Sequence, residues 1–382
     1  MTPVPTTKKR GPEIRALTGA RLIPVVLIVL FHYHEWFGYS GELWYDTIVS
    51  KGYLWVEFFF ALSGFILFYV YAARFGERLD ASAIGAFLAA RVSRLYPLQL
   101  TTLLAVVIME VDRRTVESRL AGASMFNVPV FPGRTALTFL SNLFMIQAWN
   151  IHDHLLSWNA PAWFVSVEFF LYLICPILIL LVGVRFGWRP LALATASIVL
   201  LVALVKTSGS GLDISYHNGI LRGLADFGIG LSLGVLFVAG RKKDEGRKPL
   251  PSGAHTLAQL GALGAVAAGL CLSGPARTPR DLMVAGPIFA LVFLLAFDRG
   301  LVAQALHAPW LMKLGEWSFA IYMVHYTVLS VLPHAWLQAT PWLDCMVGIG
   351  GSIVAGGLAW RFIERPFSEI MRKRLRKAFR LT

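Results

Sequence analysis

Long apolar segments alternate with short polar connections along almost the whole chain. Stretches of about 17 or more mostly apolar residues, the length of a membrane-spanning helix, recur throughout. Hydropathy marks eleven candidate spans, two of them only 15 residues long, at about 17–37, 52–73, 97–111, 134–148, 161–183, 190–206, 219–239, 255–273, 281–297, 317–337 and 344–362. The pattern predicts an all-α fold, a polytopic transmembrane helical bundle.

The distribution of basic residues reduces the predicted number of crossings to about ten. The N-terminal residues 8–15 and the C-terminal residues 371–382 are both basic and favour the cytoplasm, which requires an even number of crossings. The basic loop 241–248 also favours the cytoplasm. One of the apolar segments before this loop therefore does not cross the membrane. The weakest segment is 134–148, which is short and polar. We expect it to form a re-entrant or interfacial helix on the outer side, in an N-in, C-in topology.

The composition excludes several other classes of protein. The chain is 56% hydrophobic and 15% charged, with a mean hydropathy of +0.62, so we expect one membrane domain over residues 1–370, surrounded by the lipid bilayer. The basic cytoplasmic tail 371–382 would follow it. Orientation in the membrane accounts for the net charge of +13, and no nucleic-acid partner is expected. The cysteines show no disulfide or metal spacing, and His152 and His154 lack further ligands, so no metal site is expected.

Ionisable residues within the apolar segments mark a candidate site. Arg21 and His32 are eleven residues apart in the first segment, which is roughly 16 Å along one face of a helix. When the charges orient the segments, Glu57 and Glu168 fall at about the depth of His32. Ionisable groups in a membrane are costly and commonly mark functional sites. A carboxylate beside His32 would orient it as a general base for a hydroxyl group, whereas the alternative is a structural cluster that holds helices together.

A second candidate site lies on the cytoplasmic side of the third span. Arg91 and Arg94 are three residues apart, so they share one face of a helix. Planar guanidinium groups bind phosphates well, but an arginine pair at this position could also anchor the protein to lipid headgroups. Within the sixth span, Arg222 and Asp226 are four residues apart, and we interpret them as a neutralising pair.

The motifs around these residues resemble those of the acyltransferase-3 family of bacterial integral membrane O-acyltransferases. The resemblance covers about residues 14–370 and rests on six stretches in order: Arg21-(ten residues)-His32, Val56-Glu57-Phe-Phe-Phe-Ala-Leu-Ser-Gly64, Arg91-x-x-Arg94-x-Tyr96-Pro97, Trp163-Phe164-Val-Ser166-Val-Glu168, Gly315-Glu-Trp-Ser318-Phe-Ala-Ile-Tyr322-Met-Val-His325 and Glu364-Arg-Pro366. Glu57 stands where aspartate is usual in the family, and Phe164 stands where serine is common.

The resemblance implies transfer of an acyl group from acyl-CoA, with acetyl-CoA the expected donor, to a hydroxyl of a carbohydrate or glycosylated acceptor. His32 would be the catalytic base, oriented by Glu168 or Glu57. The donor would be bound by Arg91, Arg94 and Arg21, with supporting roles for Trp163, Ser166, Tyr322 and His325. Direct attack and a transient acyl-histidine both stay open, as does the oligomeric state. The expected location is the bacterial cytoplasmic (inner) membrane.

Many members of that family carry a fused extracytoplasmic hydrolase-like domain. We expect none here, so the membrane domain would act on its acceptor alone, for example a lipid-linked glycan, an exopolysaccharide or a glycosylated small molecule.

Two other kinds of membrane protein would also carry charged groups within their spans. A secondary transporter that uses intramembrane histidine and glutamate would usually show internal repeats and broken helices at the midplane, and neither is evident in the sequence. A flippase or an assembly partner would need no phosphate site paired with a base on the outer side. Release of free CoA from acyl-CoA in the presence of an acceptor distinguishes an acyltransferase from both.

Overall fold

The computed structural model describes residues 13–37, 43–119, 133–151, 157–185, 187–215, 217–243, 250–331 and 341–378. These residues form helices joined by loops and contain no β-strand, so the predicted all-α fold is confirmed. The longer helices are α2 (Leu22–Phe37), α4 (Trp55–Phe75), α5 (Ala81–Arg119), α7 (Trp163–Val182), α8 (Trp188–Ser208), α9 (Gly219–Lys243), α10 (Ser252–Ser273), α11 (Leu282–Leu295), α13 (Pro309–Val331), α15 (Pro341–Ala359) and α16 (Arg365–Ala378). The shorter ones are α1 (Arg15–Ala20), α3 (Leu43–Val49), α6 (Ala136–Leu143) and α12 (Leu301–Ala305), with 3-10 turns η1 (Gly52–Leu54), η2 (Ala160–Ala162) and η3 (Pro279–Asp281) and the π-helical turn η4 (Trp360–Glu364).

Eight helical segments within the described ranges are long and apolar enough to cross a membrane. They are Arg15–Trp36, Tyr45–Phe75, Ala81–Thr115, Ala160–Val182, Trp188–Ser208, Gly219–Arg241, Ser252–Ser273 and Leu343–Ala378. The other two expected spans coincide with α11, which has only 14 residues, and with α13, beyond which residues 332–337 lie outside the described ranges. Helix α6 has eight residues and is too short to cross, as predicted for the segment 134–148.

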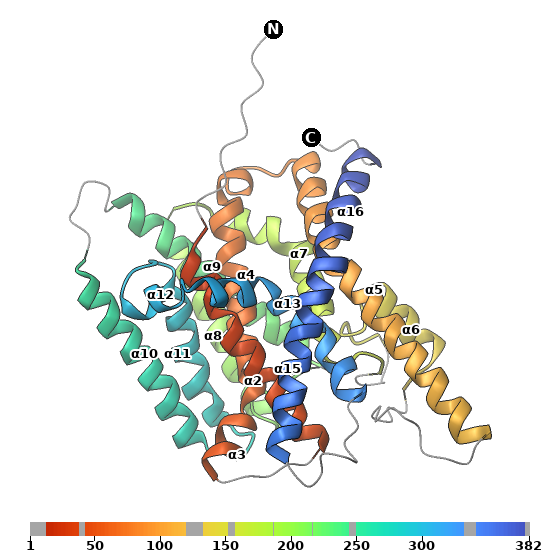
Figure 1. Cartoon of the computed structure of the whole chain (residues 1–382). Coiled ribbons are helices and arrows are strands. Elements are labelled where there is room, and N and C mark those ends of the chain that lie inside the picture. Colours follow the sequence, from red (N-terminus) through yellow and green to blue (C-terminus); the bar gives the residue numbers. More distant parts are fainter. Residues whose placement is uncertain are drawn as a thin grey trace.

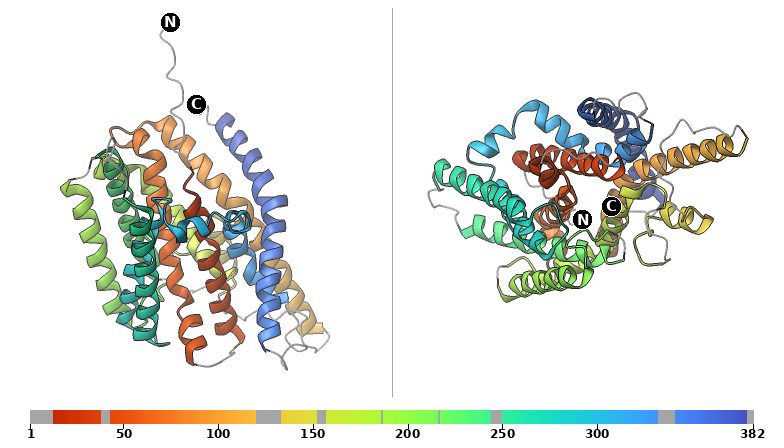
Figure 2. Two further views of the ribbon diagram at one scale, coloured as in Figure 1. Left: turned by 60° about the vertical axis from the view of Figure 1, so that its left-hand side comes forward. Right: turned by 90° about the horizontal axis from the view of Figure 1, so that it is seen from below.

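Helices α4 and α9 pack closely together inside the bundle. An added Cβ at Gly64 on α4 would lie 2.2 Å from the carbonyl oxygen of Phe227, and one at Gly230 on α9 would lie 2.0 Å from that of Ala61. Small residues at such crossings let two backbones approach closely, which strengthens helix packing in a membrane. Figure 2 shows α2 and α4 between the blue C-terminal helices and the green helices α7 and α8.

The first apolar segment is not one continuous helix. Helix α1 ends at Ala20 and α2 begins at Leu22, with Arg21 in a turn between them. Pro24 explains the break, because proline has no N–H to donate to the carbonyl four residues earlier, at Ala20. Arg21, at this break, lines two cavities inside the bundle.

A buried ion pair joins three connecting segments at the end of the bundle where α4 begins. The Lys51 ammonium donates to Asp281 over 2.5 Å, and neither side chain is exposed to solvent. The Asp281 carboxylate also accepts from the Tyr53 hydroxyl (2.7 Å) and from the backbone N–H of Leu212 (2.9 Å). The starts of α4 and α11 and the α8–α9 loop are therefore fixed to one another. In Figure 1, α3 lies at one end of the bundle and α16 extends to the other end.

The sidedness of the bundle can be tested at the two ends of α9. His217 and Arg241 are both exposed, and we expect the first on the outer side and the second in the cytoplasm. In a Cys271→Ser background, a membrane-impermeant maleimide should label His217→Cys in intact cells and Arg241→Cys only after permeabilisation. Cys175 and Cys345 are buried and should stay unlabelled. Labelling of Arg241→Cys in intact cells would contradict the N-in, C-in topology.

Candidate active site

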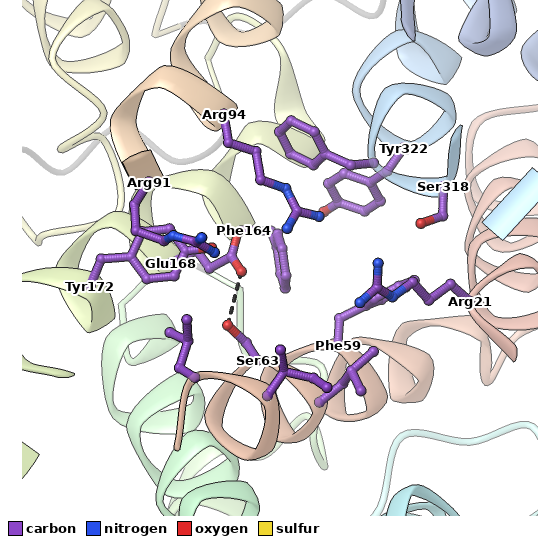
Figure 3. Close-up of a pocket in the computed structure, with 14 residues that line it drawn as sticks. Arg21, Phe59, Ser63, Arg91, Arg94, Phe164, Glu168, Tyr172, Ser318 and Tyr322 are labelled. Carbon is purple, nitrogen blue, oxygen red and sulfur yellow. Dashed lines mark hydrogen bonds between the residues drawn. The ribbon is translucent and has the colours of Figure 1, made fainter. Parts of the chain in front are cut away.

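Three cavities follow one another through the bundle. The first, here called the arginine cavity, has a volume of about 650 Å³ and lies between the α1–α2 turn and helices α4, α5, α7 and α13. Its polar lining consists of Arg21, Ser63, Arg91, Arg94, Glu168, Tyr172, Ser318 and Tyr322. Figure 3 shows the three guanidinium groups directed into it from different sides.

The second cavity contains His32 and is here called the histidine cavity. Its volume is about 690 Å³, and its lining includes His32, Glu35, Trp36, Tyr53, Trp163, Asp213, Arg222, Arg277 and Tyr322. Tyr322 lines both this cavity and the arginine cavity, so the two cavities adjoin each other at the Tyr322 side chain.

The third cavity, here called the vestibule, adjoins the arginine cavity on its other side. It has a volume of about 900 Å³ and shares Arg21, Ile66 and Arg94 with the arginine cavity. Its remaining lining comes from α1 and its N-terminal flank, from α4 and α13, and from Trp360 and Glu364 at the start of the C-terminal helical extension. The vestibule, the arginine cavity and the histidine cavity therefore form one series along the bundle.

The arginine cavity carries an excess of positive charge. Arg21, Arg91 and Arg94 are opposed by Glu168, whose carboxylate accepts a hydrogen bond of 3.1 Å from the Ser63 hydroxyl (Figure 3). The Nε atom of Arg91 is buried and has no hydrogen-bond partner among the described residues. Three guanidinium groups beside one carboxylate, with a buried donor unused, suit an anion that accepts several hydrogen bonds, such as a phosphate.

In the histidine cavity, His32 forms a hydrogen bond with a second histidine, His325 of α13. The His32 Nδ1 and His325 Nε2 atoms are 3.0 Å apart, and His325 Nδ1 is 2.5 Å from the carbonyl oxygen of Tyr322. Because a carbonyl only accepts, His325 Nδ1 must carry a proton, and Nε2 of the neutral ring is then an acceptor. His32 therefore donates from Nδ1, which leaves the lone pair of its Nε2 free for a substrate proton.

Aromatic rings fix the orientation of this histidine pair. The Trp36 ring stacks on His32 with centroids 4.8 Å apart and lies nearly parallel to His325, at 3° and 6.2 Å. Sequence reasoning missed Trp36, although its position four residues after His32 places it on the same face of the helix. Glu35, which also lines the cavity and lies three residues after His32, was missed as well.

The structure does not bring Glu57 to His32, contrary to the role expected for it. Its carboxylate accepts two hydrogen bonds from Arg222, of 2.7 and 3.1 Å, and both side chains are almost fully buried. Arg222 is therefore hydrogen-bonded to Glu57, while Asp226, the predicted neutralising partner, lies close enough for charge attraction but does not bind it directly. Neither carboxylate oxygen of Asp226 has a hydrogen-bond partner among the described residues.

Glu168 does not lie at the level of His32 either. It lines the arginine cavity, so of the two expected carboxylates neither orients the histidine in this structure. His34 lines none of the three cavities, and its ring is 6.4 Å from that of Tyr45. His325 instead is the group that binds His32 directly.

Two further predicted residues support the cavities from α7. Trp163 lines the histidine cavity, and the guanidinium of Arg222 lies 5.7 Å from the centre of its ring. Ser166 lines neither cavity, because its hydroxyl accepts from the backbone N–H of Ala148 (3.0 Å) and so holds the turn after α6 against α7.

Two ion pairs share Arg277 where the histidine cavity meets solvent. Arg277 contacts Glu35 over 2.9 Å and Asp213 over 2.7 Å, and all three side chains are partly exposed. Burial raises the pKa of the Asp213 carboxyl above its ordinary value, and the nearby Arg277 opposes this effect. Asp213 and Arg277 come from separate loops, so no local sequence signal could have paired them. The described residues contain no cluster of three or more His, Cys, Asp or Glu side chains that could hold a metal ion.

Comparison with known proteins identifies relatives over most of the chain. The acyltransferase-3 family pattern, described as an acyltransferase domain, matches residues 14–361. The acyltransferase MdmB of Streptomyces mycarofaciens is 26% identical over 355 residues, which cover 86% of this chain and 84% of MdmB. Protein 2 in the picA locus of Rhizobium radiobacter is 30% identical over 169 residues, which cover 38% of this chain and 82% of that protein. No solved structure matches the chain.

The buried pair of Glu57 and Arg222 can be tested by its effect on stability. Glu57→Gln would leave the guanidinium charge buried without its counter-ion, which costs about 3–5 kcal/mol. We expect a clearly lower Tm for this variant in detergent. The matched control is Asp226→Asn on α9, which replaces a buried carboxyl that has no hydrogen-bond partner in the described part of the chain and should change Tm much less. Equal losses in the two variants would contradict the assignment of Glu57 as the partner of Arg222.

Proposed function

Because this chain belongs to the acyltransferase-3 family of membrane acyltransferases, we propose that it transfers an acyl group from acyl-CoA to a hydroxyl group of a carbohydrate or glycosylated acceptor. Acetyl-CoA is the proposed donor, and the bacterial cytoplasmic membrane is the proposed location. One observation carries the proposal: a cavity with unbalanced arginine charge adjoins a cavity in which a histidine has a free lone pair.

The donor is proposed to enter through the vestibule and to bind with its phosphates in the arginine cavity. Arg91 and Arg94, which project from one face of α5, would contact the phosphates together with Arg21. In a helix, the interval from residue 21 to residue 32 spans roughly 16 Å. The extended pantetheine arm of CoA can cover this interval, so the thioester would reach the histidine cavity while the phosphates stay with the arginines.

His32 is proposed to act as the general base. The free Nε2 lone pair accepts the proton of the acceptor hydroxyl as its oxygen attacks the thioester carbonyl carbon. The carbon–sulfur bond then breaks, and the proton on His32 passes to the departing CoA sulfur. His325 is a positioning residue in this scheme, because its hydrogen bond holds the proton of His32 on Nδ1.

The outer part of the histidine cavity is proposed to bind the acceptor. Trp36, Trp163 and Tyr53 present aromatic surface there, while Glu35 and Asp213 offer carboxylate oxygens. Aromatic faces pack against the apolar faces of sugar rings, and carboxylates accept hydrogen bonds from sugar hydroxyls. This mixture of groups supports a carbohydrate or glycosylated acceptor.

Replacing the two histidines of α2 tests the proposed base. His32→Ala should abolish acceptor-dependent release of CoA from acetyl-CoA by the purified protein, while the protein remains folded and inserted. His34→Ala is the matched control on the same helix, and it should keep substantial activity because His34 lies outside the cavity. Turnover at the wild-type rate in His32→Ala would overturn the assignment of the base.

Donor kinetics test the proposed phosphate site. Each charge-assisted contact is worth on the order of 1.5–3 kcal/mol, so Arg94→Ala should raise KM for acetyl-CoA about tenfold or more. Arg94→Lys should rescue only partly, since an ammonium keeps the charge but lacks the planar fork of donors. KM for the acceptor should change little. Arg361→Ala is the control, because Arg361 is exposed and lines none of the three cavities. An unchanged donor KM together with full rescue by lysine would instead indicate a lipid-anchoring role.

A further inference from the structure

Three aromatic side chains lie at the junction of the arginine and histidine cavities. They are Phe59 of α4, Phe164 of α7 and Tyr322 of α13, here called the aromatic collar. The Phe164 ring contacts both of the others, with centroids 5.4 Å from Tyr322 and 6.2 Å from Phe59. All three line the arginine cavity, and Tyr322 also lines the histidine cavity (Figure 3).

The helices place the collar between the two chemical centres. Phe164 of α7 is four residues before Glu168 of the arginine cavity and four after Ala160 of η2, which lines the histidine cavity. On α4, Phe59 likewise lies between Ser63 and Val56. On each of the two segments, about one turn of helix therefore separates the collar residue from a lining residue of either cavity.

Packing and hydrogen bonding fix two members of the collar in place. The Tyr322 hydroxyl donates a buried hydrogen bond of 2.7 Å to the carbonyl oxygen of Pro161. The Phe164 ring stacks on the fully buried ring of Phe60, with centroids 4.5 Å apart at 28°. Rotation of Tyr322 would break this buried hydrogen bond and leave its own hydroxyl without that acceptor, and rotation of Phe164 would open a void in the core. Two of the three collar side chains, Phe164 and Tyr322, are therefore held in place rather than free to swing aside.

We propose that the aromatic collar selects the acyl group by its cross-section. The inference rests on the proposed function, in which the phosphates stay at the arginines and the acyl end passes the collar to reach His32. The geminal methyl groups of pantetheine lie close to the phosphates, so only the unbranched part of the arm and the acyl group itself cross the collar. Straight short acyl groups fit such a passage, whereas a branch beside the carbonyl meets Phe164 or Tyr322.

Widening the collar provides the test. The measured quantity is kcat/KM for isobutyryl-CoA divided by kcat/KM for acetyl-CoA with one acceptor. One extra methyl group in a tight apolar site changes discrimination by about 10–200-fold, so Phe164→Ala should raise this ratio at least tenfold. Phe169→Ala is the control on the same helix: its ring stacks on Trp149 and lines none of the three cavities, so the ratio should stay at the wild-type value.

A second position keeps the test decisive if Phe164→Ala does not fold. Phe59 is only partly buried, and Phe59→Ala should raise the same ratio. The proposal is overturned if the folded collar variants keep the wild-type ratio, or if Phe169→Ala raises it equally. Wild-type protein that releases no CoA from any acyl-CoA would instead overturn the proposed function.

Discussion

A guanidinium group buried among helices requires a counter-charge and a partner for nearly every N–H, and Arg222 organises its surroundings to meet that requirement. Besides two bonds to Glu57, it donates to the carbonyl oxygens of Tyr53 (2.9 Å) and Ile214 (3.2 Å). Tyr53 in turn binds Asp281, which binds Lys51. Removing one member of such a network exposes the others to the full cost of desolvation. The wall of the histidine cavity formed by α4 and α9 depends on this chain of bonds.

The sequence predicted the helical class, and it singled out His32 and the three arginines that line the cavities, because charges inside apolar segments are rare and their spacing along one helix is readable. It did not predict which way a side chain faces. Glu57 lies near the expected depth but faces α9, where it neutralises Arg222. Long-range packing decides which neighbouring helix a given face contacts. Here Gly64 and Gly230 each lie against the backbone of the opposite helix and so bring α4 and α9 together.

Glu168 was misplaced for a different reason. A depth for Glu168 follows from the sequence only if the start of its span, near Pro161, is taken to lie at the membrane surface. In the structure, the segment before α7 is itself buried, including Trp158, Asn159 and Pro161. The loop that covers it starts near Arg134, whose guanidinium binds Glu110 and the Tyr326 hydroxyl. Helix α7 therefore begins inside the protein, and Glu168 lies at the level of the arginines.

The arginine cavity has a kinetic consequence under the proposed function. Its three guanidinium groups would contact the part of the donor that acyl transfer leaves unchanged, so free CoA keeps the contacts that acyl-CoA had. Binding energy of this kind holds substrate and product equally and does not accelerate the chemical step. Release of CoA would then have to precede the next turnover and would slow it. Free CoA would also inhibit the enzyme, because it occupies the site that acyl-CoA needs.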